Sequence, residues 1–167
     1  RIEPGMATTD GGRQLARTVE AVRPLRGKRM DDYKIRVSKD YISFCAAHFI
    51  IYRGTQCERL RGHNYSVAVE IDGTLGDDFL VFDFIELKGI LKRICDEIDH
   101  RMLVPMQSHN LEIAADETQV EVKYQDRRWV FPRDDCVLLP IENTTAELLA
   151  RWFAHRLADD LRSRTGA

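Results

Sequence analysis

The sequence predicts an α+β fold in which β-strands form a sheet and two helices pack on one of its faces. Residues 41–50 and 63–71 alternate apolar with polar side chains, a period that is typical of strands with one buried face. Residues 83–98 and 143–161 instead place apolar side chains at helical spacing, and each segment begins with capping residues. A chain of 167 residues is long enough for a single domain with a substantial core.

The composition narrows the class of protein. Hydrophobic residues make up 44% of the chain and the formal net charge is −2, a balance that argues neither for a disordered chain nor for a nucleic-acid binder. No apolar run has the length of a membrane span, and the N-terminus does not read as a signal peptide. The cysteines form no C-x-x-C pair, which predicts reduced thiols and a soluble, cytoplasmic protein. They are Cys45, Cys57, Cys95 and Cys136.

Residues 1–32 form a basic N-terminal extension that differs from the rest of the chain. Its apolar stripe is thin, since only Leu15, Val19 and Val22 share helical spacing. We therefore expect a solvated tail or a partner-docking helix, ahead of an arm that binds nucleic acid or phosphate. The basic residues are Arg13, Arg17, Arg23, Arg26, Lys28 and Arg29.

The first strand is predicted over residues 33–51, with a break at Ser38-Lys39-Asp40. His48 shares the parity of Phe44 and Ala46 in this strand, so its imidazole projects from the apolar face. Residues 53–56 read as the turn that follows.

His63 shows the same feature in the next strand, where it has the parity of Tyr65 and Val67. A hairpin would bring the two imidazoles to metal-ligand distance, with Cys57 in the connection between the strands. The alternative is that each is a core histidine with a ring nitrogen bonded to a backbone group.

The first predicted helix begins at Asp83, which has capping-box spacing to Glu86, and it places Cys95 among its core positions. Asp99 and His100 follow at its end, where a carboxylate and an imidazole could share a proton transfer. The alternative for this dipeptide is a helix terminus in which the helix dipole favours His100.

A hairpin inserted between the two predicted helices is expected over residues 118–131, with its turn at Gln125-Asp126, and we assign it no chemistry. The second helix opens at Asn143-Thr144-Thr145-Ala146-Glu147, where Thr144 and Glu147 have capping-box spacing.

Five motifs in this order resemble those of the 6-pyruvoyltetrahydropterin synthase and 6-carboxytetrahydropterin synthase family. The resemblance extends over residues 33–161, and the order of the motifs is more specific than any one of them. The motifs are Phe44-Cys45-Ala46-Ala47-His48, Cys57-x-x-x-Arg61-Gly62-His63-Asn64-Tyr65, Asp83-Phe84-x-x-Leu87-Lys88, Asp99-His100 and Asn143-Thr144-Thr145-Ala146-Glu147.

The resemblance implies the tunnelling fold for residues 33–167, an antiparallel sheet with two helices packed on one face and several subunits closing an oligomeric barrel. It implies a lyase that releases triphosphate from 7,8-dihydroneopterin triphosphate, with sites between subunits of a homo-oligomer. His48 and His63 would be zinc ligands and Cys57 the base, assisted by the Asp99 and His100 pair. Thr144 and Thr145 would bind the pterin ring.

The sequence departs from the family at the centre of this site. The family pattern reads His-Gly-His where this chain has Arg61-Gly62-His63, and a guanidinium has no lone pair for a metal. Catalytic zinc normally takes three protein ligands, so either His109 or Cys57 completes the Zn²⁺ site or the metal is absent. In the family a pair of strands follows the second helix and carries a glutamate that anchors the pterin, whereas the given sequence ends at Ala167. Whether these strands are lost from the protein or only missing from the given sequence stays open.

Two functions follow as hypotheses. The first is a lyase that gives a 6-pyruvoyl- or 6-carboxy-tetrahydropterin. The second is a non-catalytic descendant that binds a pterin or purine or serves as a scaffold, in which Arg61 holds a phosphate or carboxylate.

Overall fold

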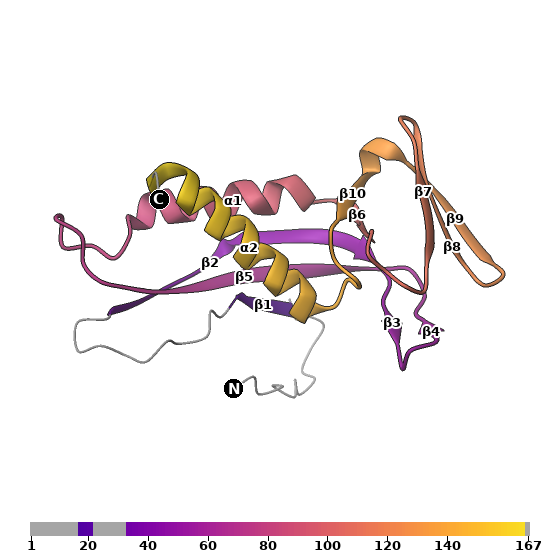
Figure 1. Cartoon of the computed structure of the whole chain (residues 1–167), viewed down its shortest axis with the longest axis horizontal. Helices are drawn as coiled ribbons and strands as arrows, with labels where there is room; N and C mark the ends of the chain where they lie inside the picture. The colour runs from indigo at the N-terminus through magenta and orange to yellow at the C-terminus, as the bar shows by residue number, and fades with distance from the viewer. Residues whose placement is uncertain (1–16, 22–32, 166–167) are drawn as a thin grey trace.

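The computed structural model describes residues 17–21 and 33–165, which form one main sheet with two helices on one face (Figure 1). The sheet has the order β1-β5-β2-β6-β10. Its strands are β1 (Arg17–Ala21), β2 (Tyr33–His48), β5 (Arg61–Gly73), β6 (Arg101–Pro105) and β10 (Cys136–Leu139). The helices are α1 (Phe84–Ile98) and α2 (Ala146–Thr165). The α+β prediction is confirmed, although the sheet is mixed: β2 and β5 are antiparallel, whereas the other neighbouring strands are parallel.

The predicted break in the first strand is a β-bulge in β2. Between Ser38 and Ser43 the chain advances five positions, while its partner β5 moves only from Ala68 to Ser66. This odd excess of residues reverses the parity of β2, so that Val37 and Ile42 both face the core although one is odd-numbered and the other even-numbered.

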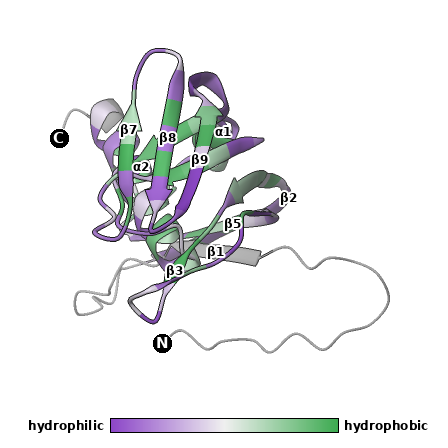
Figure 2. Cartoon of the chain, turned by 90° about the vertical axis from the view of Figure 1, so that its right-hand side faces the viewer, coloured by the Kyte–Doolittle hydropathy of each residue, from purple (hydrophilic) through white to green (hydrophobic). Residues whose placement is uncertain are grey.

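Two small sheets extend one end of the molecule. The short strands β3 (Ile51–Tyr52) and β4 (Gln56–Cys57) flank the predicted turn, where Gly54 has a φ of 74°. The predicted hairpin is β8 (Gln119–Tyr124) and β9 (Arg127–Pro132), and β7 (Glu112–Ala115) adds a third strand that the alternation pattern did not indicate. Figure 2 views this three-stranded sheet from its own end of the molecule. The short 3₁₀ helix η1 (Arg133–Asp135) connects β9 to β10.

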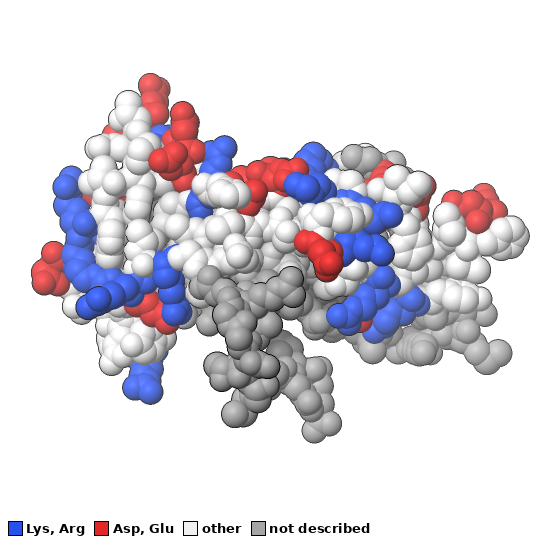
Figure 3. Space-filling model, turned by 180° about the vertical axis from the view of Figure 1, so that it is seen from behind, with Lys and Arg blue, Asp and Glu red and all other residues white. Residues whose placement is uncertain are grey.

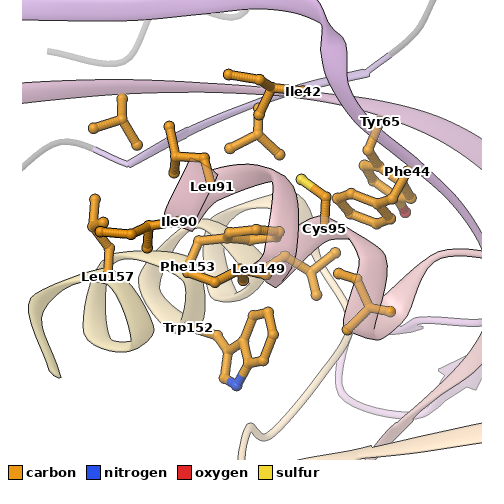
Figure 4. Packing of buried hydrophobic residues seen from close by; sticks show 14 of the residues in the cluster. Ile42, Phe44, Tyr65, Ile90, Leu91, Cys95, Leu149, Trp152, Phe153 and Leu157 are labelled. Carbon is orange, nitrogen blue, oxygen red and sulfur yellow. The ribbon is translucent and has the colours of Figure 1, made fainter. Parts of the chain in front are cut away.

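The main core lies between the large sheet and the two helices (Figure 4). Phe44 of β2 stacks on Tyr65 of β5 with ring centroids 4.7 Å apart, and Phe153 of α2 stacks on Phe44 at 5.7 Å. Leu91 and Cys95 of α1 are fully buried in the same cluster, as the helical spacing predicts.

A second, smaller core lies beneath the three-stranded sheet. Phe49 stacks on Trp129 of β9 at 4.8 Å, and Cys57 packs against the edge of this cluster. The inserted strands therefore cover the end of β2 and the connection that carries Cys57.

The first helix is capped by the predicted residue, and the cap of the second helix lies one residue after the predicted one. Asp83 caps α1 by accepting hydrogen bonds from the N–H groups of Ile85 at 2.6 Å and Glu86 at 3.2 Å. At α2 the side chain that accepts from the first turn is Thr145, which bonds Leu148 N–H at 3.4 Å, whereas the predicted cap Thr144 turns inward and is fully buried.

Part of the predicted N-terminal extension belongs to the main sheet. Arg17–Ala21 forms β1, which pairs in parallel with Tyr65–Val69 of β5 and so covers that edge of β5. The other basic residues of residues 1–32, and the tail, helix or arm expected there, lie outside the described residues. Neither helix in the described part of the chain combines the length and hydropathy that a membrane crossing needs.

Candidate functional site

The hairpin of β2 and β5 brings His48 and His63 together at one end of the sheet. In its register Ala46 lies opposite His63, and His48 lies opposite Arg61. The two imidazole rings have centroids 5.1 Å apart and meet edge to face at 69°. His48, Arg61 and His63 therefore share one face at the end of this strand pair.

His48 is a buried histidine with hydrogen bonds at both ring nitrogens. Its side chain is 1% exposed. Nδ1 lies 3.1 Å from the Thr144 carbonyl oxygen, and Nε2 lies 3.1 Å from the Tyr65 hydroxyl. The neutral tautomer with its proton on Nδ1 satisfies both contacts, since Nδ1–H donates to the carbonyl and Nε2 accepts from Tyr65. This is the geometry of the core-histidine alternative.

Asn143 and Thr144 connect the start of α2 to the end of β2. The Asn143 side chain accepts from Ile51 N–H at 3.2 Å and donates to the Ile51 carbonyl at 2.6 Å. The Thr144 hydroxyl donates to the Phe49 carbonyl at 2.8 Å. Thr144 is fully buried, so of the two threonines predicted to bind a pterin, Thr145 is the one with exposed surface.

Arg61 forms an ion pair with Glu58 at the position where the family has its middle histidine. Its side chain is 40% exposed and that of Glu58 is 23% exposed. Arginine cannot ligate a cation, and its charge repels one. The pair places a fixed positive group beside His63, on the face that His48 shares.

The donors present do not fit a three-histidine zinc site. His48 engages both ring nitrogens, and the residue opposite it is Arg61. Within the described residues no group of three His, Cys, Asp or Glu side chains is arranged to hold a metal. The two residues expected as substitute ligands, His109 and Cys57, therefore do not complete a site with His48 and His63 in this chain.

Cys57 lies in β4 against the inserted three-stranded sheet. Its Sγ accepts a hydrogen bond from Arg127 Nη2 at 3.3 Å and lies 3.4 Å from the Glu58 carbonyl oxygen. Burial raises the pKa of the Cys57 thiol, the Arg127 charge opposes that rise, and Glu58 adds to it. Arg127 is thus the cation in contact with this sulfur.

Asp99 and His100 form a hydrogen-bonded pair beside the edge of β2 that pairs with β6. His100 Nδ1 and Asp99 Oδ2 are 2.9 Å apart, and the His100 side chain is 80% exposed. Asp99 Oδ1 accepts from Cys45 N–H at 2.7 Å, and His100 N–H donates to the Cys45 carbonyl at 2.6 Å. The pair thus bonds the backbone of β2, whereas Cys57 belongs to the separate two-stranded sheet β3-β4.

Asp99→Asn is expected to lower the thermal stability of the fold at neutral pH, and the difference from the unaltered chain is expected to disappear in acid. Burial by itself raises the pKa of Asp99, but hydrogen bonds from Cys45 N–H and from His100 outweigh it and hold the pKa below its usual value. A depressed pKa stabilises the fold above the unfolded value of about 3.9, and this stabilisation disappears as pH falls through the folded value. Thermal unfolding measured at several pH values tests this.

The control for this experiment is Asp77→Asn, which removes an exposed carboxylate from the loop before α1. It is expected to change the midpoint little at any pH. A deficit for Asp99→Asn that is equally large at acid and neutral pH would show that the carboxylate charge does not matter.

The sequence pattern missed two side chains of the candidate site. Tyr65 has the parity of a core residue, but its hydroxyl completes the hydrogen bonding of His48. Arg127 lies on the hairpin to which we assigned no chemistry, yet it contacts Cys57. Its signal was present in the alternation of β9, where Arg127 shares the inner face with Trp129 and Phe131.

Comparisons with known proteins agree with the resemblance seen in the motifs. The family model for 6-pyruvoyl tetrahydropterin synthase matches residues 36–167. A putative 6-carboxy-5,6,7,8-tetrahydropterin synthase from Methanocaldococcus jannaschii is 37% identical over 123 residues, which are 73% of this chain and 75% of that protein. The 6-carboxy-5,6,7,8-tetrahydropterin synthase of Haemophilus influenzae is 31% identical over 130 residues, or 75% and 83% of the two chains. The structure of 6-pyruvoyl tetrahydropterin synthase from Plasmodium falciparum has a TM-score of 0.72 and 30% identity, and it covers 80% of this chain and 85% of its own.

Proposed function

Because this chain belongs to the 6-pyruvoyl tetrahydropterin synthase family, we propose that it is a carbon–oxygen lyase of pterin or deazapurine biosynthesis. Its substrate is 7,8-dihydroneopterin triphosphate. The products are triphosphate and 6-pyruvoyl-tetrahydropterin or, with uptake of one water, triphosphate, 6-carboxy-tetrahydropterin and the other two side-chain carbons as acetaldehyde. The observation that carries the proposal is the Asp99–His100 pair, whose atoms lie 2.9 Å apart with the imidazole open to solvent. A carboxylate that orients an exposed imidazole is suited to proton transfer.

The proposed reaction begins with the thiolate of Cys57. It takes a proton from a side-chain carbon of the substrate, the electrons of that C–H bond form a double bond, and the adjacent C–O bond breaks. Triphosphate leaves with the electron pair of the C–O bond. His100 relays the proton during the rearrangement, and Asp99 holds the imidazole in place. Family members hold zinc that polarises the side-chain oxygens, but the donors here do not fit it, so we assign zinc no step.

A homo-oligomer is part of the proposal, because the resemblance to the family implies sites that lie between subunits. Cys57 belongs to the separate sheet β3-β4, whereas Asp99 and His100 contact Cys45 of β2, and a second copy that brings these two places together would complete the site. All four cysteines are free thiols, which supports a reducing, cytoplasmic location.

Charged side chains of both signs lie at the end of the molecule that carries Cys57. Figure 3 shows Lys and Arg side chains gathered along the end of the molecule that carries β3, β4 and the three-stranded sheet, with carboxylates among them. Several of these cations pair with carboxylates of the same region, as Arg61 does with Glu58 and Arg128 with Glu121.

Triphosphate release from dihydroneopterin triphosphate tests the proposal directly. We expect the purified chain to release triphosphate with formation of a tetrahydropterin, detected by chromatography. Since the described donors do not fit zinc, a chelator is expected to leave the rate unchanged. Binding of the substrate with no release would reject the lyase.

The Arg61–Glu58 ion pair favours one second candidate, a non-catalytic protein that binds a pterin or purine or acts as an assembly scaffold. A guanidinium at this position suits a phosphate or carboxylate group of a ligand. Pterin binding that is weakened by Arg61→Gln, together with no triphosphate release, would support this candidate.

A further inference from the structure

The inserted hairpin carries a guanidinium that is committed to Cys57. Arg127 Nη2 donates to Cys57 Sγ at 3.3 Å and to the Glu58 carbonyl at 2.7 Å, and Nη1 donates to the Cys57 carbonyl at 3.1 Å. One side chain therefore holds both the backbone and the sulfur of the proposed base.

Aromatic side chains fix the orientation of this guanidinium. Its central carbon lies 4.6 Å from the ring centroid of Trp129 and 5.9 Å from that of Tyr124. Tyr124 in turn donates a hydrogen bond to the Thr55 carbonyl in the turn before Cys57. The planar group is thus held by β8 and β9 while its N–H groups point at the β4 segment.

The surroundings of the sulfur give Arg127 an electrostatic role as well. The charged groups that act on Cys57 are Arg127 from β9 and Glu58 from its own segment. Burial and Glu58 both favour the neutral thiol, and Arg127 is the group that favours the thiolate. A backbone anchor would need only the two carbonyl contacts, so the sulfur contact is an additional feature.

We infer that Arg127 is a positioning residue for Cys57, whose guanidinium fixes the sulfur and stabilises the thiolate that the proposed lyase reaction requires. This inference rests on the proposed function for its role in catalysis, while the effect on the thiol itself can be measured without substrate. The hairpin that covers the second core thereby becomes part of the catalytic arrangement.

The pH dependence of Cys57 alkylation tests this inference. Iodoacetamide reacts with the thiolate, so the rate at Cys57, read by peptide mass spectrometry, gives the pH midpoint of its ionisation. We expect Arg127→Gln to raise this midpoint by about one pH unit, which lowers the alkylation rate near neutral pH about tenfold. Arg127→Lys keeps a charge near the sulfur and is expected to raise the midpoint less.

The matched control is Arg128→Gln on the outer face of the same strand, where Arg128 bonds Glu121. It is expected to leave the Cys57 midpoint unchanged, and Cys45 in each sample serves as the internal reference. Equal midpoints for Arg127→Gln and Arg128→Gln would overturn the inference. If Arg127→Gln does not fold, Arg127→Lys against Arg128→Lys decides in the same way.

The outcome is separable from that of the proposed function. A raised midpoint in Arg127→Gln without any triphosphate release by the unaltered chain would keep the assignment of Arg127 and reject the lyase. If the Cys57 midpoint is unchanged in Arg127→Gln while the unaltered chain releases triphosphate, the positioning role of Arg127 is rejected and the lyase proposal stands.

Discussion

Replacing Cys57 by serine is expected to lower triphosphate release by about 10²- to 10⁴-fold, because a hydroxyl at this position is a far weaker base than a thiolate. The substitution removes only the acid–base group, since serine is close in size to cysteine. The expected loss is in kcat, with KM for dihydroneopterin triphosphate little changed. Steady-state kinetics of the two proteins measure both quantities.

Cys95→Ala provides the control for this loss. Cys95 is fully buried in α1, and burial raises its pKa to about 12, so its thiol stays protonated and takes no part in catalysis. The variant is expected to keep its kcat while losing some stability from the small cavity. A Cys57→Ser protein that releases triphosphate at the rate of the unaltered chain would remove Cys57 from the mechanism.

The strands and helices could be predicted because their periodicity records burial directly. The alternation in residues 41–50 and 63–71 placed His48 and His63 on the face that the structure buries, and the spacing after Asp83 identified the core side of α1. These patterns depend on side chains that are close in sequence. The short strands β6 and β7 carry too few residues for a period. The position of β6 follows from pairing with the distant strands β2 and β10, and that of β7 from pairing with the neighbouring strand β8.

The contacts of the candidate site were less predictable, because they join segments far apart in the chain. Thr144 has the spacing of a cap, yet the end of β2 offers it the Phe49 carbonyl and His48, and Thr145 takes the capping position. Arg127 reaches Cys57 across 70 positions of sequence. A local pattern indicates which face of a strand or helix a side chain occupies, but it does not identify the residue from a distant segment that the side chain contacts on that face.

The same limit applies to the zinc prediction. The sequence indicated that Arg61 occupies a ligand position, and the structure adds the acceptor that holds it, Glu58. It also adds that both ring nitrogens of His48 are already engaged. The position of the expected zinc ligand is therefore occupied by the Arg61 guanidinium, and His48 beside it belongs to a buried hydrogen-bond network.

Arg61→His is expected to convert this site into one that retains zinc through purification. The residue at 61 lies directly opposite His48 and two positions from His63, so a histidine there completes three donors on one face. The substitution also removes the charge that repels a cation. Binding through Nε2 of His48 requires the Tyr65 hydroxyl to move away, a cost that three zinc–nitrogen bonds exceed.

Elemental analysis of protein purified without added zinc or chelator measures the gain. We expect little zinc in the unaltered chain, a near-stoichiometric amount in Arg61→His, and no gain in the control Arg59→His, whose exposed side chain lies before β5. Near-stoichiometric zinc in the unaltered chain would contradict the donor geometry described above. If zinc and triphosphate release both appear only in Arg61→His, then Arg61 has switched off an ancestral lyase, and the binding function of the unaltered chain becomes the better proposal.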